Sequence, residues 1–373
     1  MKSLCSRSRA TRSRSVRADN ARRGLTLVEL VLAAGLLALL LAAVFKLLDQ
    51  FMGVWEKAEL RRMEVEQSSG VSELLAADLD ALEPGPRGDF LAEWILFDLD
   101  GDGVAESKWP RVRMVRHATD AELARLQAGS EEKLVGEGLI EVLWALTPSY
   151  PGTRELDQRP YGLLWRGERI VGPPRGADVS FFDDKAFSGG GAPRPGSAHA
   201  VTSNVIWMGM TFATSTSDLR QGWKAGLAVE ECPRSWDAWA RKRPNEDRHP
   251  WNEIAAHMPR AGQTPTLPRR VRLEFELENV SDLKRRTRLV RYASPQDATL
   301  EVDDALKLPE IGAHVLIDAE WMEIVGVAGR TVSVRRAQRG AKAGHHESGA
   351  LVHFGRTLVR EVPIAQHRGE WGL

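Results

Sequence analysis

The chain has 373 residues, and its 51 basic and 51 acidic side chains give a formal net charge of zero. The charge is uneven: residues 1–24 hold eight Lys and Arg against one acidic residue, and the mildly acidic remainder argues against nucleic acid as a partner. Two cysteines, Cys5 and Cys232, exclude a disulfide framework and a structural zinc site built on cysteines.

The first expected element is an apolar helix that follows this basic segment. Residues 30–45 are 16 consecutive apolar or small residues, and extending the run back to Leu25 adds one charged residue, Glu29. At about 1.5 Å per residue this run spans about 30 Å, the thickness of one bilayer core. We therefore expect a transmembrane segment over residues 25–46, with its basic side in the cytoplasm.

Two ordinary interpretations of this segment stay open at this point. A secretory signal peptide needs a small-residue cleavage site after its apolar run, and the helix-forming text after Phe45 contains none. A plain signal anchor leaves Glu29 unexplained, because a carboxylate inside a membrane span costs about 2.5–3.5 kcal/mol.

A third interpretation comes from the text "RRGLTLVE" at residues 22–29, which resembles the processing site of type IV prepilins and pseudopilins. The resemblance implies that residues 1–24 are a leader, which prepilin peptidase removes by cutting after Gly24. Leu25 then becomes the N-methylated first residue, where the family usually has Phe, and Glu29 becomes the fifth.

The resemblance also implies that Glu29 serves subunit assembly. A carboxylate and a new amino group in hydrocarbon are each costly, and pairing Glu29 with the Leu25 amine of a neighbouring subunit would neutralise both. Small residues in the same segment would let neighbouring helices approach closely. These residues are Ala33, Ala34, Gly35, Ala38, Ala42 and Ala43.

The helix is expected to continue well beyond the membrane. Apolar residues recur at three- and four-residue steps as far as Leu82, where Pro84 and Gly85 end the pattern, and Gly70 is a candidate break. Strand-like runs joined by loops follow. They are "EWILFDL", "PRVRMVRH", "LIEVLWALTP", "YGLLWRGERIVG", "SNVIWMGMTFAT" and "RRVRLEFELEN".

These elements predict an α+β fold in which a long N-terminal helix packs on an antiparallel sheet, as in pilin-like proteins. The pilin-like head would cover residues 47–292. Three short segments look most like the J-type minor pseudopilin of type II secretion. They are "VSELLAADLDAL", "YGLLWRGER" and "RRVRLEFELEN".

Two insertions are expected in this head. The first, a large loop at about 183–265, opens with a flexible "SGGGAPRPGS" text and holds five tryptophans, which either pin the loop to the head or form an exposed interface. The second, at 293–356, alternates short strands with glycine turns and is similar to small β units of viral tail and surface-assembly proteins. Residues 357–373 would then form a return strand and tail.

Candidate ligands are few. The text "DLDGDGVAE" places Asp98, Asp100, Asp102 and Glu106 in a calcium-loop pattern, but Trp109 occupies the twelfth position, so an EF-hand is rejected. A weaker calcium site and a solvated turn between strands both stay open. In "GHHESG" at 344–349, adjacent histidines in a strand would point to opposite faces, which makes joint metal binding awkward.

The sequence carries no GxSxG, HExxH, P-loop or GxGxxG motif, so we expect no enzyme and no certain cofactor. The resemblance implies a minor pseudopilin near the tip of a periplasmic type II secretion pseudopilus, in a bacterial inner membrane with the head outside. Its partners would be prepilin peptidase, I-, K- and H-type minor pseudopilins, the major pseudopilin and membrane lipid. A minor pilin of a type IV pilus or DNA-uptake machine, a tip adhesin and a membrane-anchored periplasmic binding protein are the alternatives.

Overall fold

The computed structural model describes residues 26–97, 107–128, 138–149, 161–172, 179–188, 191–213, 235–239, 264–278 and 286–365. The chain divides into two units, Met1–Glu59 and Leu60–Leu373, which are described separately. One helix, α1 (Leu27–Asp80, 54 residues), supplies the described part of the first unit and enters the second. It is continuous through Gly70, so the break suggested by the sequence does not occur.

The first half of α1 is long and apolar enough to cross a membrane. The apolar stretch Leu27–Trp55 has 29 residues, and none of its most apolar window is buried within the chain. At about 1.5 Å per residue, 29 residues would reach about 43 Å, more than the ~30 Å of a bilayer core. Leu37 and Phe45, for example, are 59% and 67% exposed. The predicted candidate transmembrane helix is therefore confirmed.

The second half of α1 belongs to the head and is amphipathic. Its buried side chains recur every three or four positions, which places them on one face of the helix. They are Ser68, Val71, Ser72, Leu75, Ala76, Asp78 and Leu79. This face packs in the same hydrophobic core as the inner side chains of the large sheet.

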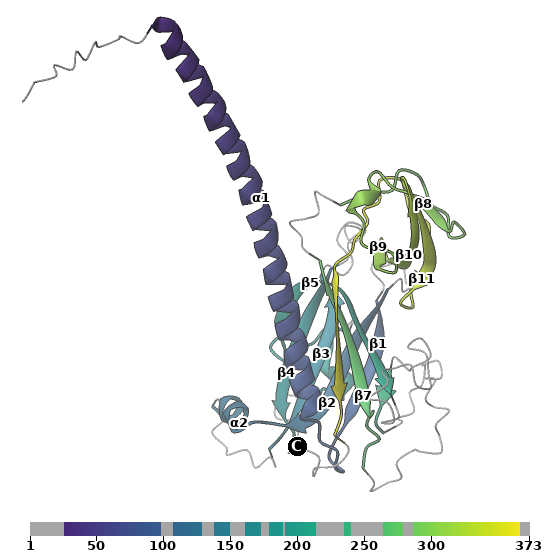
Figure 1. Cartoon of the computed structure of the whole chain (residues 1–373). Helices are drawn as coiled ribbons and strands as arrows, with labels where there is room; N and C mark the ends of the chain where they lie inside the picture. The colour runs from purple at the N-terminus through teal and green to yellow at the C-terminus, as the bar shows by residue number, and fades with distance from the viewer. Residues whose placement is uncertain are drawn as a thin grey trace, which may run out of the picture. The chain divides into compact units, whose positions relative to one another are not determined.

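The head is built on an eight-stranded antiparallel sheet in the order β12-β7-β5-β4-β3-β2-β1-β6 (Figure 1). The strands are β1 (Phe90–Phe97), β2 (Ser107–His117), β3 (Leu139–Pro148), β4 (Gly162–Ile170), β5 (His199–Ala213), β6 (Trp236–Asp237), β7 (Arg270–Leu277) and β12 (Arg356–Pro363). A short helix, α2 (Asp120–Gln127), follows β2, and a 3-10 turn spans Asp184–Ala186. The broad α+β class is confirmed, with more sheet than helix in the head.

The large sheet is strongly curved. The rings of Phe90 on β1 and Phe212 on β5 lie 5.8 Å apart, although three strands separate β1 from β5 in the sheet. In a flat sheet, four strand spacings would separate them by about 19 Å. The sheet therefore curls around its own core, and Trp144 of β3 is fully buried within it.

The prediction that residues 183–265 form one large loop insertion is wrong. The segment contains β5, a 15-residue strand inside the large sheet, because the apolar run from Val205 to Phe212 is buried on both faces. Trp207 lies in β5, and the indoles of Trp236 and Trp239 donate to the carbonyls of Thr266 (2.8 Å) and Gly88 (2.9 Å). These three tryptophans hold their parts of the segment on the head. Trp223 and Trp251 lie outside the described residues.

Residues 286–355 form a second, small β unit, here called the barrel. Its four-stranded sheet has the order β8-β11-β10-β9, and a 3-10 turn follows β8 at Ala305–Lys307. The strands are β8 (Thr299–Glu301), β9 (His314–Ile317), β10 (Glu320–Ala328) and β11 (Thr331–Gln338). Bridges between Leu289 and Val302, Arg288 and Leu351, and Leu316 and His353 close this sheet into a ring.

The barrel is inserted between two neighbouring strands of the head. It follows β7 and precedes β12 in sequence, and β12 pairs with β7 along its whole length. The barrel has its own hydrophobic core, which includes Met322, Ile324 and Val334. Its two ends are adjacent, because the Val352 N–H donates to the Thr287 carbonyl at 3.1 Å.

Candidate functional site

Glu29 lies in the first turn of α1 and closes the start of that helix. Its carboxylate accepts from the backbone N–H and the hydroxyl of Thr26, both at 3.0 Å. In return, the Thr26 hydroxyl accepts from the Glu29 N–H at 3.3 Å. This reciprocal arrangement is a capping box, which satisfies backbone donors that have no partner inside the helix.

The capping box gives Glu29 a local role that our sequence reasoning missed. The signal was present, because Thr26 and Glu29 have the T-x-x-E spacing of a capping box ahead of an apolar run. Gly24 and Leu25, the predicted cleavage and methylation residues, lie outside the described residues. The described part of the site is thus a capped, exposed apolar helix with one carboxylate at its start.

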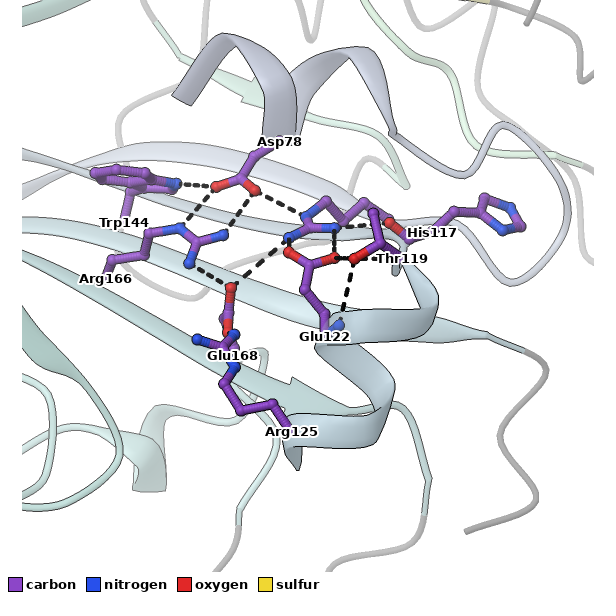
Figure 2. A network of polar contacts seen from close by, with 9 residues as sticks. Asp78, His117, Thr119, Glu122, Arg125, Trp144, Arg166 and Glu168 are labelled. Atoms are coloured by element: carbon purple, nitrogen blue, oxygen red, sulfur yellow. Dashed lines mark hydrogen bonds and ion pairs between the residues drawn. The ribbon is translucent and has the colours of Figure 1, made fainter. Parts of the chain in front are cut away.

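Asp78 fixes the far end of α1 to three strands of the head (Figure 2). Its carboxylate accepts from the Trp144 indole at 2.7 Å and from two nitrogens of Arg166 at 2.8 and 2.9 Å. Arg116 forms a further ion pair with it at 2.8 Å. Asp78, Arg116 and Arg166 are all buried, so α1 is held by strong, desolvated contacts to β2, β3 and β4.

A second tier of charges neutralises these arginines. Arg116 donates to both oxygens of Glu122 at 2.5 and 3.0 Å, and this hydrogen bonding lowers the pKa of Glu122 to about 2. Arg166 and Arg125 both pair with Glu168. Glu122 also closes a capping box with Thr119 at the start of α2, so the network ties α1, the sheet and α2 together.

The predicted calcium ligands are not placed. Asp98, Asp100, Asp102 and Glu106 lie in residues 98–106, which connect β1 to β2 and are outside the described residues. In the described part of the chain, no three His, Cys, Asp or Glu side chains are grouped as metal ligands. Of the two adjacent histidines, His345 stacks on Tyr292, whereas His346 is buried and bonds to Asp318 and Glu320.

Comparison with known protein-family models gives no match, and comparison with curated protein sequences gives none either. The residues of the N-terminal segment and the geometry of α1 are therefore the features that indicate a function.

Proposed function

We propose that the protein is a minor pseudopilin, a structural subunit of a filament that assembles through α1 after prepilin processing. The register of Gly24 and Leu25 just before α1, with Glu29 in the first turn of its exposed apolar half, carries the proposal. In this proposal the basic residues 1–24 stay on the cytoplasmic side until cleavage, and the head projects from the inner membrane into the periplasm.

Two structural features support an assembly role. The apolar half of α1 is exposed on all sides within this chain, so it is suited to lie in lipid and among other helices. The Asp78 network holds the second half of the same helix on the sheet through buried contacts. A long helix packed on an antiparallel sheet is also the architecture that the pilin-like resemblance implies.

The capping box favours a second candidate, a membrane-anchored extracytoplasmic binding protein. If Glu29 only completes the helix start with Thr26, its carboxylate needs no partner subunit. The two candidates therefore differ in whether the negative charge of Glu29, or only its hydrogen-bonding shape, is required.

N-terminal sequencing tests processing. The full chain is produced with and without a co-expressed prepilin peptidase, and the mature N-terminus is read by mass spectrometry. We expect a methylated Leu25 only with the peptidase, and an uncut chain when Gly24 is changed to a bulky residue by Gly24→Leu. A chain that keeps Met1 in the presence of an active peptidase would contradict the proposal.

Matched variants separate charge from capping. Glu29→Gln removes the charge but keeps an oxygen that accepts from Thr26, whereas Thr26→Ala removes the cap partner and keeps the carboxylate. Cross-linking and co-purification with other minor pseudopilins measure assembly. We expect Glu29→Gln to abolish assembly and Thr26→Ala to retain it; intact assembly in Glu29→Gln favours the simple anchor.

A further inference from the structure

The barrel meets the head at a buried arginine. The guanidinium carbon of Arg339, just after β11, lies 4.7 Å from the ring centroid of Trp207 on β5 and 4.2 Å from that of Trp321 on β10. Its Nη1 also donates to Glu276 of β7 at 2.8 Å. Arg339 and Trp321 come from the barrel and Trp207 and Glu276 from the head; these four residues are called the latch.

The charged pair of the latch is buried and has further hydrogen-bond partners. The side chains of Arg339 and Glu276 are 6% and 1% exposed. The Glu276 carboxylate also accepts from the Gly355 N–H at 2.9 Å and from the Thr357 hydroxyl at 3.1 Å, where the chain returns to the head. Cation–π and charge-assisted bonds are strongest when water is excluded, so the parts of the latch reinforce one another.

The backbone at Arg339 is bent into a conformation that L-residues rarely adopt. Ala337 and Arg339 have φ values of 56° and 54°, and the following Gly340 has 78°. Positive φ at non-glycine residues is uncommon and persists where surrounding contacts hold it. The contacts of the Arg339 side chain with Trp207, Trp321 and Glu276 help to hold this backbone conformation.

The barrel itself does not need the latch to close its fold. Its strands form a closed ring, its core is separate from that of the sheet, and its adjacent ends leave the head as a pair. An inserted unit with adjacent ends is able to turn about its connections unless other contacts fix it. Trp207 of β5 and Trp321 of β10 lie apart from those connections along the chain, whereas Glu276 lies near the end of β7, beside them. The latch therefore adds contacts between barrel and head beyond the two connections.

We propose that the barrel is a distinct domain whose orientation on the head is set by the Arg339 latch, and that releasing the latch lets the barrel turn as a rigid body. The closed state presents the barrel in one orientation. Opening separates Arg339 and Trp321 from Glu276 and Trp207 together, because leaving either charge buried alone is strongly unfavourable.

Distance measurements between spin labels test this proposal on the full chain in detergent micelles. Cys5→Ser and Cys232→Ser remove the native thiols, and Lys185→Cys in the head and Leu306→Cys in the barrel introduce labels at exposed positions. Double electron–electron resonance then gives the distance distribution. We expect one narrow peak in this labelled parent and a broad distribution after Arg339→Ala.

Two further variants control for damage to the barrel. Glu276→Gln weakens the latch from the head side without changing the barrel sequence, and we expect it to broaden the distribution as well. Arg335→Ala removes a nearby barrel arginine that is 62% exposed and pairs with Glu323, and it should leave the peak narrow. A narrow peak in Arg339→Ala and Glu276→Gln, or a broad one in the labelled parent, overturns the proposal.

Discussion

His346 is held between two carboxylates inside the barrel. Its Nδ1 lies 2.5 Å from Asp318 and its Nε2 lies 2.9 Å from Glu320. Carboxylates only accept, so both ring nitrogens donate when His346 carries two protons. Burial by itself lowers the pKa of His346, but the hydrogen bonds to Asp318 and Glu320 outweigh it and raise the pKa above its ordinary value.

This arrangement predicts that the barrel loses stability as pH rises. Because the pKa of His346 is higher in the folded chain, its contribution is complete below the unfolded value of about 6.5 and is lost as pH rises through the raised folded pKa. Hydrogen exchange at Met322 and Val334, in the barrel core, measures it. We expect faster exchange at alkaline pH beyond the intrinsic base dependence.

His346→Gln should remove this extra pH dependence, and His345→Gln, which changes a histidine stacked on Tyr292, should retain it. The same pH profile in His346→Gln as in the parent would contradict the assignment.

The contacts of single side chains were the features hardest to predict from the sequence. The capping box of Glu29 was readable, because both partners lie within four residues. The partners of His346 were not, since Asp318 and Glu320 lie 28 and 26 residues away and meet it only after the barrel closes. The "HH" text predicted opposite directions for the two side chains, but not the carboxylates that one of them meets.

At the scale of elements, α1 is one helix with two different environments. Its extent was predictable, because apolar periodicity runs up to Pro84 and the chain then turns to strands. The anchor at Asp78 was not, because a carboxylate on an amphipathic helix ordinarily indicates the solvent face. Asp78 departs from that rule because Arg116 of β2 and Arg166 of β4 neutralise its carboxylate in the core.

Asp78→Ala should destabilise the head by about 3–5 kcal/mol, because it leaves Arg116 and Arg166 buried without their shared carboxylate. Urea unfolding of the full chain in micelles, followed by tryptophan fluorescence, measures the free energy. Glu73→Ala is the matched control on the exposed face of the same helix and should cost within about 0.5 kcal/mol. Equal losses in the two variants would show that the Asp78 network does not anchor α1.

At the scale of the whole molecule, the individual strands were readable from the sequence and their order was not. The runs at 139–148 and 161–172 correspond to β3 and β4, which are neighbours in both sequence and sheet. By contrast, β6 pairs with β1 at one edge, and β12 pairs with β7 across the whole inserted barrel. Such pairings depend on long-range packing, which leaves no local pattern in the text.

The division into two units predicts how the protein behaves in water. The exposed apolar half of α1 would leave many large side chains in contact with water, each at a cost of about 1.5–3 kcal/mol, so the full chain should need lipid or detergent. Residues 60–373, which keep the Asp78 network and both sheets, should remain soluble without either. Carbonate extraction followed by ultracentrifugation separates these outcomes.

A Leu36→Lys and Leu37→Lys pair places two charges inside the span, each costing about 2.5–3.5 kcal/mol, and should release the full chain from the pellet. A full chain that is soluble before these changes would mean that the apolar half of α1 is covered by something other than a membrane or partner helices.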